Sequence, residues 1–171
     1  MGRPRVVDLS DTAVILRVGS RGREGDDMQR MLSGILDAKG SEIWSVGPDD
    51  TVFDALETMA EHNIGALLVI DDDDLIGILS ERDYARKVKL LERGSKETRV
   101  AEIMTTEIRT VGPAATVTEC MESMTEHRIR HLPVLDDDGR IMGVISIGDV
   151  VKAMIAQQSD MIDQLERYIT T

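Results

Sequence analysis

The sequence predicts an α+β fold made of two pseudo-symmetric copies of one short unit. Residues 46–52 return as residues 111–117, and residues 77–83 return as residues 143–149. The offset is 116 − 51 = 65 positions for the first pair and 146 − 80 = 66 for the second, so one residue has been inserted, and we place it in the acidic turn at 136–139. A repeated unit this short cannot bury its own apolar face, which predicts that the two copies pack together.

Both copies begin with the same pattern. A β-prone segment meets Gly-Pro, and a threonine, Thr51 or Thr116, then precedes an amphipathic helix. An acid follows each threonine by three positions, as Asp54 or Glu119. This is the spacing of a capping box, so we expect the two threonines to cap helices.

Both copies also end alike, with two apolar runs around an acidic turn. These runs, at 66–70 and 75–79 and again at 132–135 and 141–145, predict a hairpin that leads directly into a second helix. The predicted order is therefore β-α-β-β-α, twice.

We divide the chain into five parts. An extension at 1–27, which we expect to be poorly ordered, precedes a helix and lead-in at 28–42, with Gly40 as the stop of the helix. The repeats follow at 43–99 and 100–153, and a C-terminal helix occupies 154–171.

Composition excludes several classes of function. The net charge of 20 − 32 = −12 and an aromatic content of 2% disfavour a nucleic-acid binder, which needs a basic surface and often stacking platforms. No apolar run is long enough to span a membrane. The single Cys120 excludes an internal disulfide, fits a reducing compartment and lies on the apolar side of a helical pattern. We therefore expect a cytoplasmic protein with a buried core thiol.

Two patterns resemble metal sites, but neither has all the features that such a site requires. The acidic run at 71–74 would need Gly and Glu at positions six and twelve of a calcium loop, where the sequence has Ile76 and Arg82. His127 and His131 have the i, i+4 spacing of a helical metal pair, but the strand from Leu132 onward ends the helix before His131. We expect a solvated turn, two diverging imidazoles and no metal.

The most informative polar motif occurs in both copies. Ser80-x-x-Asp83 and Ser146-x-x-Asp149 lie where a strand passes into a helix, and helix capping alone explains such a pair. A carboxylate in that place can also accept two hydrogen bonds from a ribose diol, while the hydroxyl and the helix N-terminus face phosphate. Occurrence of the motif at both equivalent places favours the binding interpretation.

Together with the tandem β-α-β-β-α units, the Gly-aliphatic-aliphatic-Ser-x-x-Asp endings and the segment Arg130-His131-Leu132-Pro133-Val134 resemble a CBS-domain pair, or Bateman module. The resemblance runs from about residue 43 to residue 153. It extends to stand-alone CBS-pair proteins of proteobacteria and plant mitochondria. It implies two CBS repeats packed as one pair, with adenosyl ligands held between the repeats.

The resemblance also implies the site residues. At the first site, Ser80 and Asp83 would join Arg130 and His131, with backbone near Thr110 and Val111 holding adenine. The second site would combine residues of both repeats in the same way, namely Ser146, Asp149, Gly65, Ala66, Ser45 and Val46. Gly65 and Ala66 stand where the twin has Arg130 and His131, so this second site lacks the phosphate clamp.

We therefore expect a non-catalytic regulatory module that binds AMP, ADP, ATP or an NAD-type dinucleotide and so senses energy or redox state. We also expect this module to form a homodimer and to act on a regulated protein that the sequence does not identify. No metal, nucleic acid or membrane is expected to take part. The alternative is a structural CBS pair that acts through its dimer surface without ligand. An enzyme that uses Cys120 or a histidine is a more distant alternative, because no catalytic set accompanies either residue.

Overall fold

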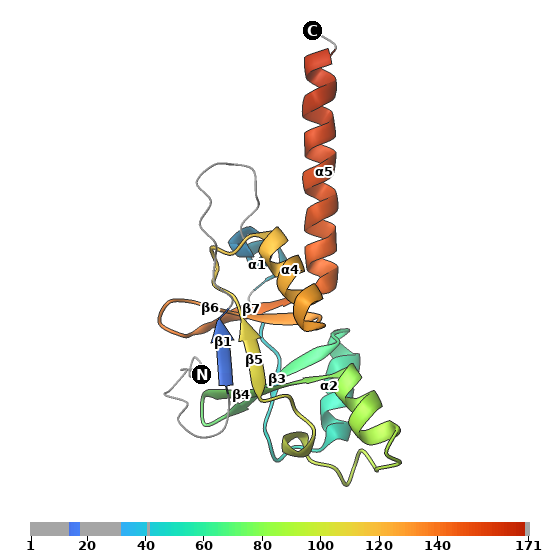
Figure 1. The fold of residues 1–171 in the computed structure, drawn as a ribbon. Helices are drawn as coiled ribbons and strands as arrows, with labels where there is room; N and C mark the ends of the chain where they lie inside the picture. The colour runs from blue at the N-terminus through green and yellow to red at the C-terminus, as the bar shows by residue number, and fades with distance from the viewer. Residues whose placement is uncertain (1–13, 18–31, 41, 170–171) are drawn as a thin grey trace. The chain divides into compact units, whose positions relative to one another are not determined.

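In the computed structural model, residues 14–17, 32–40 and 42–169 are described, and both predicted repeats are present (Figure 1). The first repeat runs through β2 (Ser45–Val46), α2 (Val52–His62), β3 (Ala66–Asp71), β4 (Asp74–Ser80) and α3 (Glu81–Tyr84), which continues as a π-helical turn, η1 (Ala85–Lys89). After a short 3-10 turn, η2 (Val100–Glu102), the second repeat runs through β5 (Glu107–Thr110), α4 (Val117–His127), β6 (His131–Leu135), β7 (Ile141–Ser146) and α5 (Ile147–Ile169). The predicted β-α-β-β-α order is confirmed.

The capping boxes predicted at the two first helices are also confirmed. The Thr51 hydroxyl accepts the N–H of Asp54 at 3.1 Å, and the Thr116 hydroxyl accepts the N–H of Glu119 at 3.2 Å. Each acid side chain in turn accepts the backbone N–H of its threonine. Both helices end on a residue with left-handed backbone, at φ 51° and 55°.

Each hairpin has the turn that the acidic residues predict. β3 and β4 are antiparallel, with Ala66 opposite Ser80, and their turn carries Asp72 and Asp73 at φ 43° and 77°. Only two residues separate these strands, whereas residues 136–140 separate β6 from β7, with Gly139 at φ 77°. The strand bounds therefore place the inserted residue in the acidic turn, as predicted.

The chain divides into two compact units that do not follow the order of the sequence. The first unit contains Glu42–Arg109 with Asp138–Ile141, and the second contains Thr110–Asp137 and Met142–Thr171 with Arg17–Ser41. The lead-in helix α1 (Leu32–Lys39) therefore belongs to the second unit, although it precedes the first repeat. Its stop at Gly40 is confirmed, because Gly40 has φ 90° and its N–H donates to the Leu36 carbonyl at 3.0 Å.

The expectation of a poorly ordered extension is wrong at residues 14–17. These residues form β1 (Val14–Arg17), which pairs with β5 in a two-stranded sheet. The Val-Ile-Leu run in β1 is apolar, and Val14 and Ile15 are β-branched, which favours a strand that has a partner edge. The remainder of the extension, residues 1–13 and 18–27, lies outside the described residues.

Each unit has its own aliphatic core. In the first unit, α2 packs on the sheet through residues that include Met59, Leu67 and Leu79. In the second, α1, α4 and α5 meet the β6–β7 hairpin through residues that include Leu132, Ile145 and Cys120. The Cys120 side chain is fully buried, which confirms the prediction of a core thiol. Of the helices in the described ranges, none is both long and apolar enough to cross a bilayer.

Candidate functional site

The Ser80-x-x-Asp83 motif lies in the first unit, where β4 gives way to α3. The Oδ2 atom of Asp83 accepts the Ser80 hydroxyl at 2.7 Å and the Ser80 backbone N–H at 3.0 Å. In return, the Ser80 Oγ accepts the Asp83 N–H at 3.2 Å. The motif is thus a capping box that fixes the carboxylate at the strand–helix junction through its Oδ2 atom.

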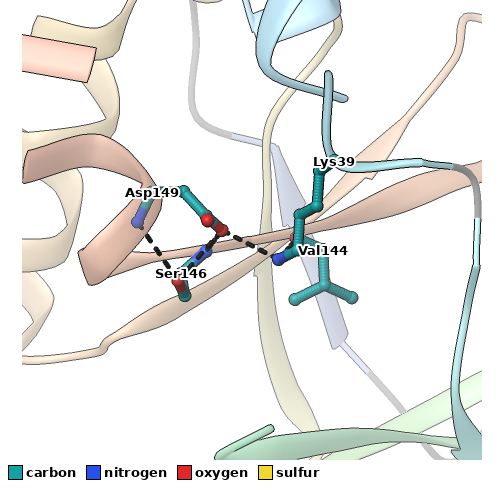
Figure 2. Close-up of polar contacts among 4 residues, drawn as sticks. All are labelled: Lys39, Val144, Ser146 and Asp149. Carbon is teal, nitrogen blue, oxygen red and sulfur yellow. Dashed lines mark hydrogen bonds and ion pairs between the residues drawn. The ribbon is translucent and has the colours of Figure 1, made fainter. Parts of the chain in front are cut away.

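The Ser146-x-x-Asp149 motif repeats this geometry in the second unit, where β7 meets α5 (Figure 2). The Oδ2 atom of Asp149 accepts the Ser146 backbone N–H at 2.8 Å and its hydroxyl at 2.9 Å, and the Ser146 Oγ accepts the Asp149 N–H at 3.3 Å. Both predicted ribose-binding aspartates are therefore held in the same orientation relative to their own helix.

The other predicted residues lie beside these junctions within each unit. The Gly65 carbonyl accepts the Glu81 N–H at 3.1 Å, and the Arg130 carbonyl accepts the Ile147 N–H at 2.8 Å, so the two junctions are built alike. Ser45 and Val46 form β2, parallel to β3. The structure thus brings Gly65 and Ala66 to Ser80 and Asp83, and Arg130 and His131 to Ser146 and Asp149. The crosswise partnerships between repeats stay a prediction.

The predicted adenine contacts need a refinement at Val111. Its backbone N–H donates to the Pro133 carbonyl at 3.1 Å, and its carbonyl accepts the Leu135 N–H at 3.0 Å. Both groups are therefore already used in a parallel bridge to β6. Hydrogen bonds to an adenine would have to come from neighbouring peptide groups, such as that of the buried Thr110.

Sequence reasoning missed Lys39, at the end of α1. Its Nζ donates to Asp149 Oδ2 at 2.8 Å and to the Val144 carbonyl at 3.0 Å (Figure 2). The Asp149 side chain is 19% exposed and the Lys39 side chain 41%, so the ion pair is partly shielded from water. A lysine outside the second repeat therefore neutralises that repeat's predicted ribose ligand.

Asp83 has a different set of partners, and these were also missed. Lys87 forms an ion pair with Asp83 Oδ1 at 3.0 Å and donates to the Ile103 carbonyl at 2.7 Å. The Thr105 hydroxyl donates to the same Oδ1 at 3.3 Å. Lys87 follows Asp83 by four residues on a helical segment, a spacing that could have predicted the pair. Lys39 lies 110 positions before Asp149, so no local spacing in the sequence could have indicated it.

The pKa values of Asp149 and His131 are both lowered, for different reasons. Burial alone would raise the pKa of Asp149, but hydrogen bonds from Lys39 and Ser146 outweigh burial and lower it. The pKa of His131 is lowered chiefly by burial and next by the Lys39 charge, with Arg130 contributing less and Asp149 opposing. The sequence alone would suggest Arg130 as the main cause, because it is the adjacent cation. Burial and Lys39 are the larger causes.

A double-mutant cycle should detect coupling between Lys39 and Asp149. We expect Lys39→Met and Asp149→Asn each to lower the free energy of unfolding, and the double variant to lose about 1 kcal/mol less than the sum, because the pair is partly exposed. Because the folded-state pKa of Asp149 is lowered, its contribution is present above the ordinary value of 3.8 and is lost as pH falls below it. Lys39→Met should therefore reduce the loss of stability in acid.

The matched control for this cycle is the Lys87–Asp83 pair, whose side chains are 42% and 13% exposed. Lys87→Met with Asp83→Asn should give a coupling of similar size, since both pairs have similar distances and exposure. The free energies of unfolding would be measured with urea. The prediction is contradicted if the effects of Lys39→Met and Asp149→Asn simply add, while those of Lys87→Met and Asp83→Asn show a clear coupling.

The two histidines diverge as predicted, because α4 ends at His127 and β6 begins at His131. Throughout residues 14–17, 32–40 and 42–169, no group of three or more His, Cys, Asp or Glu side chains could hold a metal ion. What the described residues offer is two carboxylates at strand–helix junctions, cations beside both, and Arg130 and His131 beside one. This arrangement suits a ligand with hydroxyl and phosphate groups.

Comparison with known proteins identifies the family. The CBS domain model matches residues 39–90 and again residues 100–156. The chain belongs to the CBS-domain family. A signal-transduction protein with CBS domains from Burkholderia ambifaria has 56% sequence identity and a TM-score of 0.72, covering 75% of this chain and 96% of that one. A CBS-domain protein from Agrobacterium tumefaciens has 37% identity and a TM-score of 0.71, covering 78% and 99%.

A mitochondrial CBS domain-containing protein of Arabidopsis thaliana is 45% identical over 137 residues, which are 77% of this chain and 66% of the plant protein. The chain thus spans just under two thirds of that relative. Inosine-5'-monophosphate dehydrogenase of Methanocaldococcus jannaschii is 34% identical over 112 residues, but these make up only 21% of the enzyme. Similarity to that enzyme therefore covers a small part of its length.

Proposed function

We propose that this CBS pair is a non-catalytic regulatory module that binds an adenine nucleotide, AMP, ADP, ATP or an NAD-type dinucleotide, and reports energy or redox state to a partner protein. CBS pairs commonly act as regulatory modules for adenosine-containing ligands. The observation that supports this function most directly is the pair of matching capping boxes, which hold Asp83 and Asp149 at equivalent junctions. Capping alone does not require aspartate in both copies, since glutamate serves the same purpose at Thr116.

The proposed roles follow from the chemistry of each group. Asp83 accepts the ribose hydroxyls, and Ser80 with the start of α3 faces the phosphate. Arg130 and His131 supply charge-assisted hydrogen bonds to phosphate oxygens, and peptide groups near Thr110 and Val111 hold the adenine. Ser146, Asp149, Ser45, Val46, Gly65 and Ala66 form a second, weaker site without the Arg-His clamp. Nucleotide binding would favour one arrangement of the module, which the partner protein then recognises.

Thermal unfolding with a nucleotide panel tests this function. A ligand that binds only the folded chain stabilises it by about 2.7 kcal/mol at a hundredfold excess over Kd, so the melting temperature should rise with AMP, ADP, ATP or NAD concentration. Guanosine and cytidine nucleotides are matched controls with the same phosphates. The proposal fails if no adenine nucleotide shifts the melting temperature at millimolar concentration, or if all bases act alike.

We further predict that nucleotide affinity rises as pH falls, because of His131. Burial and Lys39 lower the pKa of the empty-state imidazole, and an arriving phosphate raises it, so binding takes up a proton. The stability of the ligand-free chain changes in the opposite direction, because the unfolded imidazole binds protons more readily and the fold weakens below the ordinary value of 6.5. Calorimetry at each pH is therefore required, in place of melting temperatures.

His131→Gln is the comparison for this pH dependence, since glutamine keeps hydrogen bonding but does not titrate. The wild type should bind up to about tenfold more tightly per unit fall in pH through the imidazole titration, and the variant should show a smaller slope. Equal slopes would make His131 a packing residue at the start of β6, with Arg130 alone holding phosphate.

We also propose a homodimer located in the cytoplasm. The apolar residues exposed along α5 support self-association, since monomers rarely leave such a stripe uncovered. A CBS-CP12 protein from bloom-forming cyanobacteria, 28% identical with a TM-score of 0.65, is hexameric. The same stripe favours the second candidate function, a structural CBS pair that acts through its dimer surface without ligand. An unchanged melting temperature with every nucleotide, in a protein that still dimerises, would support that alternative.

A further inference from the structure

The C-terminal helix carries a second apolar face that its own unit does not use. α5 packs in the second unit through Val150 and Ala153, which are 0% and 7% exposed. Beyond this contact the helix continues to Ile169 and extends away from the rest of its unit (Figure 1). The CBS domain match ends at residue 156, so most of this extension lies outside the part that the family model describes.

The unused face has the spacing of a coiled-coil seam. Positions 151, 155, 158, 162, 165 and 169 are separated alternately by four and three residues, and five of the six are aliphatic. Val151, Ile155, Ile162, Leu165 and Ile169 are 41%, 59%, 56%, 55% and 83% exposed. Gln158 is the one polar member of this seam, the kind of residue that fixes register at some cost in stability. We call these six positions the α5 seam.

We propose that two copies of this chain pair through the α5 seam, with their helices antiparallel. An antiparallel pair centred near residue 160 matches every seam position with one in the other copy. Val151 meets Ile169 of the second copy, Ile155 meets Leu165, and Gln158 meets Ile162, each pair of numbers summing to 320. Such an interface is isologous, so the same contacts occur twice about one twofold axis. This proposal deepens the proposed homodimer and is independent of nucleotide binding.

The charges beside the seam select the antiparallel arrangement. Lys152, Ser159 and Glu166 recur every seven residues along one edge. Antiparallel pairing places Lys152 opposite Glu166 of the second copy at both ends, and Ser159 opposite Ser159 at the centre. The other edge carries Met154, Met161 and Tyr168, which widen the apolar contact. In a parallel pair, the edge with Met154, Met161 and Tyr168 would instead face the edge with Lys152 and Glu166. Both Lys152–Glu166 attractions would then be lost. Opposed helix dipoles also favour the antiparallel pair.

The polar residues of the extension argue for a second copy over a lipid surface. Amphipathic helices that lie on membranes carry Lys and Arg on their polar face, because the headgroups are often anionic. The exposed part of α5 from Gln158 to Ile169 carries Asp160, Asp163 and Glu166 against Arg167. This acidic balance, in a chain of net charge −12, repels an anionic membrane but does not oppose the Lys152–Glu166 pairing.

Sedimentation equilibrium of the full chain tests the seam. The wild type should sediment at twice the 18.9 kDa chain mass. In the proposed dimer the Ile162 side chain of each copy is buried, so a single substitution affects the interface twice. Ile162→Glu should therefore raise the dimer dissociation constant at least about 100-fold. Asp163→Glu, one position away and off the seam, should leave it unchanged. Circular dichroism and melting temperature confirm that each variant is folded. A monomeric wild type, or an Ile162→Glu variant that dimerises as tightly as wild type, overturns the proposal.

Charge reversal and cross-linking test the orientation. Lys152→Glu and Glu166→Lys should each weaken the dimer several-fold, and the double variant should recover it, since the opposite charges again face each other. In a Cys120→Ala background, Ser159→Cys should form an intermolecular disulfide under mild oxidation, whereas Asp160→Cys, which points away from the seam, should not. Absence of rescue together with no Ser159→Cys cross-link overturns the antiparallel pair. Binding of the wild-type chain to phosphatidylglycerol vesicles that abolishes self-association would also overturn it.

Discussion

Replacing Asp83 by alanine is expected to weaken nucleotide binding on the order of 100-fold, whereas Asp149→Ala should weaken it less than about tenfold. Each charge-assisted hydrogen bond contributes about 1.5–3 kcal/mol, and a carboxylate that holds a ribose diol makes two of them. The tighter site in our proposal combines Asp83 with Arg130 and His131. The site of Asp149 has Gly65 and Ala66 in place of that clamp. The loss of affinity should therefore be concentrated at Asp83, as measured by isothermal calorimetry.

The lysines beside the two aspartates do not create this difference. Asp83 is paired with Lys87 at 3.0 Å and Asp149 with Lys39 at 2.8 Å, so a ribose has to compete with or join an ion pair at either carboxylate. Asp83→Asn and Asp149→Asn provide the matched controls, because the amide oxygen of asparagine can still accept the Ser80 or Ser146 backbone N–H while the charge is removed. If asparagine restores stability but not affinity, the loss belongs to ligand binding.

The opposite result would be informative about geometry. Arg130 and His131 lie beside Ser146 and Asp149 within the second unit, where the Arg130 carbonyl accepts the Ile147 N–H. A larger loss for Asp149→Ala would mean that the clamp acts with the aspartate of its own repeat. Equal losses would mean that the two sites are equivalent and that the Arg-His pair does not bind phosphate.

Local rules in the sequence predicted most of the fold. The capping boxes at Thr51 and Thr116 depend on residues three apart, and the hairpin turns depend on short acidic runs, so both were visible without tertiary information. β1 was missed because a strand of four residues is defined by its partner, β5, which lies about 90 positions away in the sequence. The membership of α1 in the second unit is likewise set by packing, through Leu32 and Leu36, and leaves no local signal.

The candidate site was likewise predictable where it depends on local motifs and not where it depends on long-range contacts. Ser80, Asp83, Ser146 and Asp149 form motifs within four residues, and repetition of the motif drew attention to them. Lys39 reaches Asp149 across 110 positions, so only the fold brings the two together. Under the offset of 66 that holds after the acidic turn, Lys87 corresponds to Ala153, so the second repeat has no lysine at that position. Each aspartate is thus paired with a lysine from a different part of the chain, Asp83 with Lys87 in the helical segment that follows it and Asp149 with Lys39 at the end of α1.

The largest change in reactivity is expected at Cys120, whose thiol should be nearly inert in the folded chain. Burial, and next the charge of Glu119, raise its pKa from 9.0 to about 12, and its side chain is 0% exposed. At pH 8 the reactive thiolate is then about 1000-fold scarcer than for an ordinary cysteine, and reagents have no access to it. Reaction with a disulfide reagent should therefore follow unfolding of α4 and become fast only in guanidinium.

Thr118→Cys in a Cys120→Ala background is the matched control, because position 118 lies on the exposed face of the same helix. That thiol should react at an ordinary rate in the folded chain. Fast modification of native Cys120 at neutral pH would contradict the burial argument and reopen the enzyme alternative, since a nucleophilic cysteine requires an accessible thiolate. If Cys120 is modified slowly and the control thiol quickly, Cys120 is a core residue that helps to position α4 against β6 and β7. That result favours a binding module over an enzyme.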